Sequence, residues 1–554
     1  MLFNSHIFLI LFLPIVLTVF LLLQRGERDN LSVMWLVLAS LVFYGWAEPW
    51  FVLLLGGSLL VNYLAGKLIF REKNRKIKRF YLYFFLAADL ITLGYYKYTN
   101  FFLGIASDIL SLNMLTSKTF LPLAISFITL RKISYIVDMY VGLIKKEYSF
   151  WRFCLSVTFF PQLIAGPIVY HKEMVDQFVE PNLSTRWRDN FIVGSTLFTI
   201  GLFKKVGIAD SMSLFSSPVF EMAQSGSNVP FFIAWYAAIS FMLQIYFDLS
   251  GHADMAIGLA RMFGIRLPMN FNSPYKAKSI TEFWQRWHMT MTRFFTDYVL
   301  HPLSVHWIHR SVERKYTPMK QYFVASVFPT ILTFLIVGLW HGTGWSYVVF
   351  GIIHGVSLVA HRAWQYLKHP LHPVFGWLLT FVTTLISLVF FRAGDLSSAW
   401  RIVQGMLGLS VISLPIQLEA ALGGLARQLN DMGATIIFNG LFHLSPLHNN
   451  SLLETFCLFS IFVLLAVCLV LPNSNEMFWH HQPVVDRVLK NPVSKHWMNC
   501  FVWKPSPGWA FIIGIFICVS FMMMIDPLLL PILWWLDYCN LEWHSLVPGS
   551  VISQ

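Results

Sequence analysis

The sequence predicts an all-α protein that crosses a membrane many times. Of its 554 residues, 56% are hydrophobic and only 12% are charged, whereas a soluble domain carries about 25% charged residues. The mean hydropathy is +0.60, and many apolar runs approach the roughly 20 residues that a spanning helix needs. This composition excludes a soluble enzyme, a disordered chain and a nucleic-acid-binding module.

The candidate spanning helices follow one another along the chain. The first is expected to be retained, because it lacks both a basic n-region and a small-residue cleavage site. The candidates cover about 6–23, 31–46, 50–70, 80–98, 120–142, 191–208, 230–247, 321–340, 345–362, 374–392, 452–471 and 510–535.

Two further stretches are unsuited to simple spans. Residues 153–169 are apolar but short and rich in Pro and Gly, which predicts a re-entrant segment, since non-helical backbone at membrane depth must be covered by protein or line water. Residues 283–307 are aromatic, yet they carry Arg293 and Asp297 four residues apart. We expect these two side chains to pair on a helix that lies at the interface or faces a wet cavity.

The orientation follows from the basic clusters. The chain has 40 Lys plus Arg and 28 Asp plus Glu, a formal charge of +12, and in membrane proteins such an excess lies in cytoplasmic loops. If the N-terminus lies outside, three basic groups face the cytoplasm: Arg25 with Arg28, the cluster at 71–79, and Lys145 with Lys146. No nucleic-acid partner is needed to explain the charge.

Metal and disulfide chemistry is not indicated. The six cysteines show no CxxC spacing, which argues against a disulfide framework or a zinc knuckle. The sequence also contains no H-E-x-x-H and no Walker A motif. We therefore expect no metal and no bound cofactor.

His341 is the first candidate catalytic residue. It follows the uncharged run 328–340 and opens the glycine-rich turn HGTGW. A neutral imidazole in a shielded cavity can act as a general base. The alternative is a structural histidine that hydrogen-bonds a neighbouring helix.

His288 and Asp248 are weaker candidates. His288 ends the stretch EFWQRWH, in which Glu282 and Arg286 are four residues apart. The alternative is that this helix only anchors the chain at the level of the lipid headgroups. Asp248 opens DLSGHADM, which has Ser, His and Asp but no G-x-S-x-G elbow. This predicts a polar re-entrant or cavity-lining turn rather than a hydrolase triad.

Six stretches then point together to one family. They are LPLAISFITLRKISYIVDMYVG (121–142), FPQLIAGPIVYHKEMVDQF (160–178), GLFKKVGIAD (201–210), the long segment from FDLSGHADM to DYVLHPL (247–303), GLWHGTGWSYVVFGIIHG (338–355) and FFRAGDLSSAWRIVQGMLG (390–408). In this order they resemble the membrane-bound O-acyltransferases, and among them the membrane component of bacterial alginate and polysaccharide O-acetyltransferases.

The resemblance implies a helical fold with a central funnel or tunnel and an O-acyltransferase activity. His341 would be the catalytic residue and His288 the second site histidine. Substrate contacts are expected from the neighbouring Trp340 and Trp287 and from Asp248. Lys204 and Lys205 would attract coenzyme A phosphates, unless they are ordinary positive-inside anchors.

The resemblance also implies the partners. The donor would be cytoplasmic acetyl-CoA, and the acceptor an exopolysaccharide or cell-wall glycan outside the inner membrane of a bacterium. An SGNH-hydrolase-like protein, secreted or membrane-anchored, would complete the transfer, and lipid surrounds the chain. A transporter or flippase of a glycan precursor, or a non-catalytic scaffold of a secretion complex, is the alternative.

The resemblance covers a predicted core of residues 1–410. The remaining 411–554 form a C-terminal extension with further helices, in which 411–450 and 472–508 are expected to be loops or irregular elements outside the membrane. Within the core, residues 304–318 depart from the glycine-rich turn usual for this branch, which puts any partner contact there in doubt.

Overall fold

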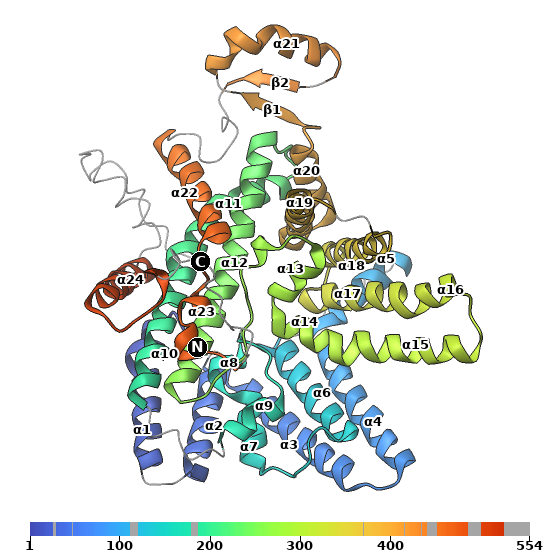
Figure 1. Ribbon diagram of the computed structural model, residues 1–554, viewed down its shortest axis with the longest axis vertical. Helices are drawn as coiled ribbons and strands as arrows, with labels where there is room; N and C mark the ends of the chain where they lie inside the picture. Colours follow the sequence, from blue (N-terminus) through green and yellow to red (C-terminus); the bar gives the residue numbers. More distant parts are fainter. Residues whose placement is uncertain are drawn as a thin grey trace.

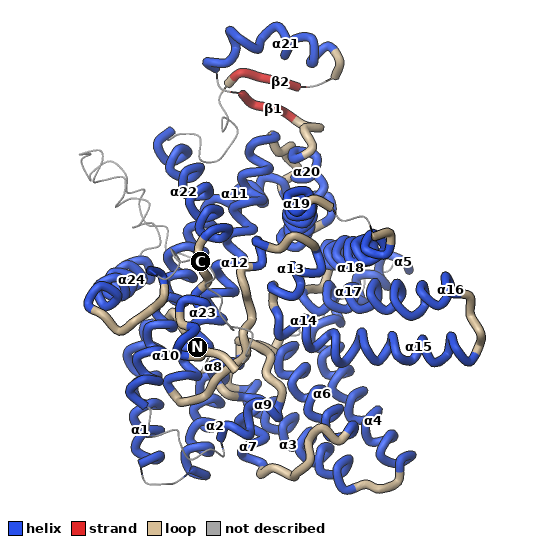
Figure 2. The backbone as a smooth tube through the Cα atoms, in the orientation of Figure 1, coloured by secondary structure: helices blue, strands red, loops and turns tan. Residues whose placement is uncertain are grey.

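The computed structural model describes residues 1–25, 29–46, 48–110, 120–164, 166–178, 187–368, 371–414, 416–433, 435–439, 451–485 and 500–525. These residues are mostly helical (Figures 1 and 2). Seven helical segments are long and apolar enough to cross a membrane: Phe8–Arg25, Trp50–Arg71, Trp187–Gln224, Phe231–Met262, Pro318–His341, Pro373–Arg392 and Pro507–Ile525. The prediction of a multi-pass membrane protein is confirmed.

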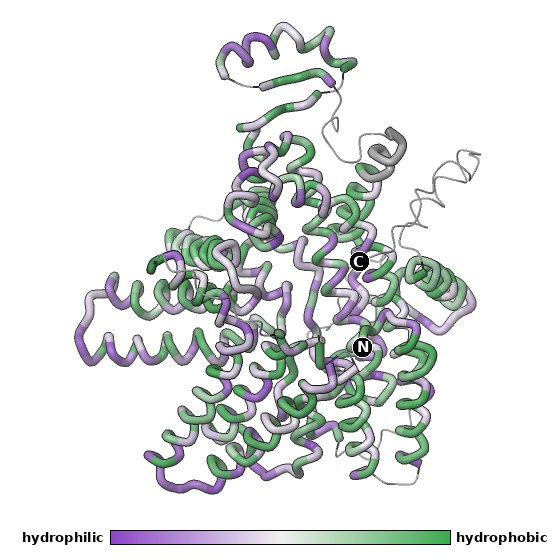
Figure 3. The backbone as a smooth tube through the Cα atoms, turned by 180° about the vertical axis from the view of Figure 1, so that it is seen from behind, coloured by the Kyte–Doolittle hydropathy of each residue, from purple (hydrophilic) through white to green (hydrophobic). Residues whose placement is uncertain are grey.

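The N-terminal helices form a bundle in the lower half of Figure 1. It consists of α1 (Leu13–Arg25), α2 (Asp29–Gly45), α3 (Trp50–Arg71), α4 (Arg75–Leu93), α6 (Ile125–Val141), α7 (Phe150–Thr158), α8 (Phe160–Leu163), α9 (His171–Val175) and α10 (Trp187–Leu202), while α5 (Thr99–Leu110) lies above it in the figure. The end of α1 and the α3–α4 and α6–α7 connections lie at one end of this bundle (Figure 1), so the basic clusters of these segments share a side. Figure 3 shows the α3–α4 connection as hydrophilic and most helices as hydrophobic.

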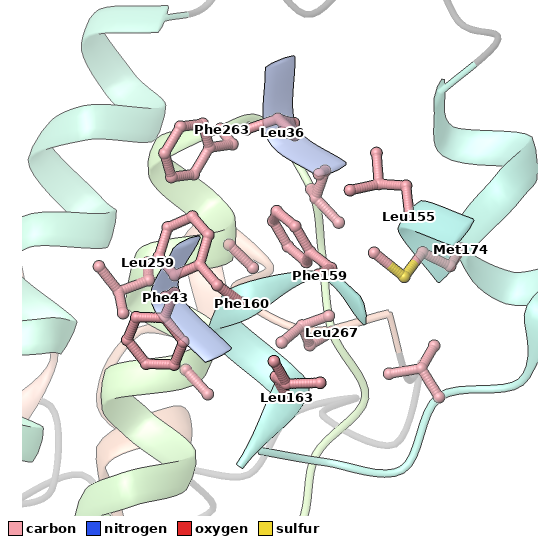
Figure 4. Packing of buried hydrophobic residues seen from close by; sticks show 14 of the residues in the cluster. Leu36, Phe43, Leu155, Phe159, Phe160, Leu163, Met174, Leu259, Phe263 and Leu267 are labelled. Atoms are coloured by element: carbon pink, nitrogen blue, oxygen red, sulfur yellow. The ribbon is translucent and has the colours of Figure 1, made fainter. Parts of the chain in front are cut away.

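Residues 153–169 are divided between elements. α7 ends at Thr158 and α8 begins at Phe160, so the backbone turns at Phe159. The aromatic side chains of this turn pack inside the bundle. Phe160 contacts Phe263, the residue that follows α12, at a ring distance of 5.7 Å (Figure 4). The broken helix is therefore covered by protein.

α12 (Phe231–Met262) is a long central helix. It packs along α10, the π-helical turn Phe203–Ala209 and α11 (Asp210–Gln224), which follow one another as one helical segment. α10 approaches closely because both helices carry glycine at the contact: a Cβ on Gly251 would lie 2.7 Å from the carbonyl oxygen of Gly201. The expected end of this span near 247, with a polar turn after it, is wrong. Residues 248–262 continue the helix, since their polar side chains find partners on neighbouring elements.

A second group of helices lies beside α12. It consists of α13 (Ile280–Arg286), α14 (Met289–Phe295), α15 (His301–Glu313), α16 (Pro318–Tyr322), α17 (Phe328–His341), α18 (Trp345–Tyr366), α19 (Pro373–Arg392) and α20 (Leu396–Met406). α14 and α15 are joined by the π-helical turn Thr296–Leu300. α15 and α16 lie antiparallel to each other and extend away from α12 (Figure 1).

The C-terminal part contains the main departure from an all-α fold. β1 (Val411–Leu414) and β2 (Thr435–Phe438) pair in parallel, with α21 (Glu419–Asp431) as their crossover, at the end of the molecule opposite the basic connections (Figure 1). After them come α22 (Ser451–Val470), α23 (Ser474–Met477) and α24 (Pro507–Ile525). Short strands escaped the sequence analysis because four residues are too few for a readable alternation.

Candidate active site

A cavity of about 760 Å³ lies where α12, α13, α17, α18 and α19 meet. Five of the seven residues predicted from the sequence line it: His341, His288, Trp340, Trp287 and Asp248. Residues 121–127 and Lys97 line it as well. Segments nearly 300 positions apart in the sequence thus contribute to one cavity, which local patterns could not have placed together.

The tight turn between α17 and α18 positions His341. Gly338 and Gly342 allow it, because a Cβ on either would lie 2.2 Å or less from Tyr347. The His341 imidazole packs on the rings of Phe350 and Phe391 at 5.9 and 5.1 Å. It is half-buried and makes no hydrogen bond to any described residue, so its ring nitrogens stay available to a substrate.

His288 lies at the break between α13 and α14. Its backbone is left-handed, with φ 43°, a conformation that costs a residue other than glycine about 1–2 kcal/mol. Its Nδ1 is buried and has no hydrogen-bond partner among the described residues. Burial lowers the pKa of His288 to about 4, so the ring is neutral near pH 7.

Trp340 connects the two histidines. Its ring lies 4.8 Å from that of His341 and 6.4 Å from that of His288. The Trp340 Nε1 is also buried without a partner in the described part of the chain. A buried nitrogen without a partner costs free energy, so these two atoms beside one cavity are candidate contacts for a substrate oxygen.

His354 is a third histidine at this cavity, which the sequence analysis did not single out. Trp284 Nε1 donates to its Nδ1 at 3.2 Å, and its Nε2 lies 2.8 Å from Ser387 Oγ. The Ser387 hydroxyl donates in turn to the Thr384 carbonyl at 2.7 Å. Both ring nitrogens are therefore occupied, and His354 has a structural role.

α12 contributes one stripe of side chains to the cavity. Phe241, Gln244 and Asp248 project into it at a helical spacing. Asp248 is held by Lys205 at 2.7 Å, and Arg392 enters from α19 with its guanidinium over the ring of Phe241. Gln244 lies outside the six stretches and Arg392 lies in the last of them, but neither was singled out from the sequence, so only the three-dimensional contacts identify them.

Lys204 and Lys205 lie outside the cavity lining. Lys204 pairs with the buried Asp254 at 2.7 Å and also donates to Ser474 of α23. Lys205 bridges Asp210 and Asp248, each at 2.7 Å. Their expected contact with coenzyme A stays a prediction.

The ion pair expected between Arg293 and Asp297 is wrong. Arg293 instead makes a two-pronged pair with Glu173 of α9, at 2.7 and 2.9 Å. Asp297 accepts a hydrogen bond from Tyr170 at 2.9 Å. Both partners come from the 160–178 stretch, so a tertiary contact replaces the local one.

The pairing of Glu282 with Arg286, four residues apart on α13, is present at 2.8 Å. This pair flanks the turn that carries Trp287 and His288. In the described part of the chain, no group of three or more His, Cys, Asp or Glu side chains could hold a metal ion.

The chain is similar to one protein family and to several known proteins. Residues 142–374 match the membrane-bound O-acyltransferase family. The chain is 36% identical to a peptidoglycan O-acetyltransferase of Helicobacter pylori, over 86% of this chain and 92% of that protein. It is 36% identical to a probable alginate O-acetylase AlgI of Pseudomonas aeruginosa (77% of this chain, 78% of that one) and 35% identical to that of Azotobacter vinelandii (73% and 78%). The chain therefore belongs to the membrane-bound O-acyltransferase family, whose members are O-acyltransferases.

Proposed function

We propose that this protein transfers an acetyl group from cytoplasmic acetyl-CoA to a hydroxyl of a cell-wall glycan outside the inner membrane, with His341 as the general base. One observation carries the proposal. Two histidines with free ring nitrogens face one largely apolar cavity, in a chain that belongs to an O-acyltransferase family.

In the proposed reaction, His341 takes the proton of the acceptor hydroxyl as its oxygen attacks the thioester carbonyl. The tetrahedral intermediate then collapses, the C–S bond breaks, and the thiolate recovers the proton from His341. General base catalysis contributes about 10²–10⁴-fold. His288 and Trp340 would orient the acceptor hydroxyl or the acyl carbonyl through their unpartnered nitrogens.

The acceptor that we favour is peptidoglycan. The alignment with the Helicobacter pylori peptidoglycan O-acetyltransferase covers 86% of this chain, about 476 residues, so it necessarily extends beyond residue 410 into the C-terminal part. The alignments with the two alginate proteins cover 77% and 73% of this chain, about 427 and 404 residues, so they leave more of it unmatched. An alginate-like exopolysaccharide is the second candidate.

Asp248, Gln244 and Arg392 would bind this acceptor. Sugar recognition needs hydrogen-bonding side chains next to aromatic surfaces, and the cavity provides both, with Trp287 and Trp340 as the aromatic walls. Lys205 would hold the Asp248 carboxylate in place.

The proposed direction of transfer requires a fixed orientation. The basic residues of 71–79 would lie in the cytoplasm and the N-terminus outside. A cysteine placed at Asn74, in a background without the native cysteines, should resist an impermeant maleimide applied to intact cells. Ready labelling would reverse the orientation.

The test of the function uses purified protein and acetyl-CoA labelled in the acetyl group. An acetyltransferase should release thiol and transfer label to a muropeptide fragment, and transfer to the intact polymer should require an SGNH-hydrolase-like partner. Absence of any thioester turnover, with and without that partner, would refute the proposal. Efficient polymer acetylation by the chain alone would remove the partner from it.

A further inference from the structure

Lys97 is a half-buried cation at the cavity, and the proposed reaction gives it no role. It lies in the π-helical turn Gly94–Tyr98, which joins α4 to α5. Its ammonium lines the cavity together with His288 and His341. No described carboxylate pairs with it.

The contacts of Lys97 place its ammonium beside the reacting centre. Nζ donates to the backbone carbonyl of Trp340, the residue before His341, and lies 3.4 Å from Ser126 Oγ. It also lies 5.9 Å from the centre of the Trp340 ring. An ammonium has three N–H donors, so at least one remains for a ligand in the cavity.

We propose that Lys97 is a catalytic residue that stabilises the oxyanion formed on the thioester carbonyl. This proposal rests on the proposed function. When the acceptor oxygen bonds to the carbonyl carbon, the π electrons move to the carbonyl oxygen, which accepts a hydrogen bond from Nζ. When the C=O bond re-forms and the C–S bond breaks, that charge passes to sulfur, and Lys97 keeps its proton throughout.

The environment favours a transient anion over a permanent one. The cavity walls near Lys97 are mostly apolar, from Leu121 to Phe127, so the several charges of a nucleotide would be poorly solvated there. A single developing charge in a dry cavity is stabilised strongly by a preorganised donor.

Lys97 also has a structural contact, which the test must separate from catalysis. The last carbonyls of α17 have no helical partner, and Lys97 and Tyr98 supply one each: Tyr98 donates to the Leu339 carbonyl at 2.8 Å. Tyr98 does not line the cavity. Tyr98→Phe is therefore a matched control that weakens the same helix end without touching the cavity.

The experiment measures thiol release by monodisperse wild type, Lys97→Met, Lys97→Arg and Tyr98→Phe. Loss of one oxyanion donor lowers kcat by about 10²–10³-fold, so Lys97→Met should lose that factor while KM for acetyl-CoA changes little. Lys97→Arg should recover part of it. Equal losses in Lys97→Met and Tyr98→Phe would show a positioning role and overturn the proposal.

A second acetyl donor distinguishes oxyanion stabilisation by Lys97 from phosphate binding by Lys97. The thioester S-acetyl-N-acetylcysteamine carries no phosphate, so Lys97→Met should slow its turnover as much as that of acetyl-CoA. A defect confined to acetyl-CoA and expressed in KM would overturn the oxyanion role. If the wild type turns over neither donor, the proposed function itself is contradicted.

The pH profile gives an independent readout. The titratable and charged groups that share the cavity with Lys97 are His288, His341, His354, Asp248, Tyr347 and Arg392. Turnover should fall at alkaline pH as the Lys97 ammonium loses its proton, and Lys97→Arg should shift this limb upward, because a guanidinium stays protonated there. An unchanged limb in Lys97→Arg would contradict the assignment.

Discussion

Buried polar groups are arranged differently in the N-terminal bundle and around the cavity. In the bundle, Lys132 pairs with Asp89 at 2.7 Å and with Ser58 at 2.6 Å, and Arg131 donates to the carbonyls of Val157 and Gln162. Around the cavity, His288 and His341 keep ring nitrogens free of described partners. Buried atoms without a described partner occur in the bundle as well, among them His171 Nε2 and Gln162 Oε1. What distinguishes His288 and His341 is that they line a cavity large enough for a substrate, whereas the charged pairs of the bundle hold the fold.

The largest effect is expected from His341→Ala. If His341 is the base, turnover per folded molecule should fall about 10²–10⁴-fold, while detergent stability changes little, since no described partner loses a hydrogen bond. The measurement is acetyl transfer normalised to monodisperse protein. Near-normal turnover per folded molecule would remove His341 from the mechanism.

Lys132→Met should have the opposite effect: it should lower thermal stability and leave turnover per folded molecule unchanged. Removing one partner of a buried ion pair typically costs about 3–5 kcal/mol, because it leaves the other charge unpaired. The side chains of Lys132 and Asp89 are 4% and 7% exposed, so water cannot compensate. Thermal unfolding in detergent should shift down strongly, and the double variant Lys132→Met, Asp89→Leu should recover much of the shift. A stable Lys132→Met that has lost turnover would contradict the comparison.

His354→Ala tests the comparison within the cavity itself. It leaves Trp284 Nε1 and Ser387 Oγ without their ring partners, at about 1–3 kcal/mol for an unsatisfied buried group. The variant should unfold at a lower temperature but keep turnover per folded molecule. A stable, inactive His354→Ala would show that the cavity uses three histidines rather than two.

The sequence predicted a membrane protein and most of its spans, because a helix that crosses the lipid needs a long run of apolar residues. It was wrong where polar residues interrupt such a run. Asp248 and Asp254 suggested a turn after 247, yet α12 continues to Met262, since Lys205 and Lys204 neutralise these carboxylates from the adjacent helix. Partners that lie far away in the sequence cannot be read from local hydropathy.

The candidate site could be predicted only where a motif carried it. His341 and His288 lie in recognisable stretches, and the structure brings both to one cavity. Lys97 and Gln244 lie in helical sequence outside the six stretches. Arg392 lies in the last of these stretches, but nothing in the sequence singled it out. Only the fold brings the turn Gly94–Tyr98, α12 and α19 to one cavity, which gives these three side chains a shared environment.

The smallest effect is expected from substitutions of His288, where effects on thermal stability and on acceptor binding must be told apart. Its left-handed backbone suits glycine or asparagine better than alanine, so Ala at this position mixes strain with loss of the ring. His288→Gly should relieve about 1 kcal/mol of backbone strain and unfold no earlier than wild type. It should nevertheless raise KM for the acceptor, because Nδ1 no longer binds its hydroxyl.

His288→Asn is the matched variant, since asparagine tolerates the same backbone and keeps a hydrogen-bonding group at the cavity. Its KM for the acceptor should lie between those of wild type and His288→Gly, at similar thermal stability. If all three proteins share one acceptor KM, the unpartnered nitrogen of His288 binds no acceptor. His288 would then belong with His354 among the residues that shape the cavity wall.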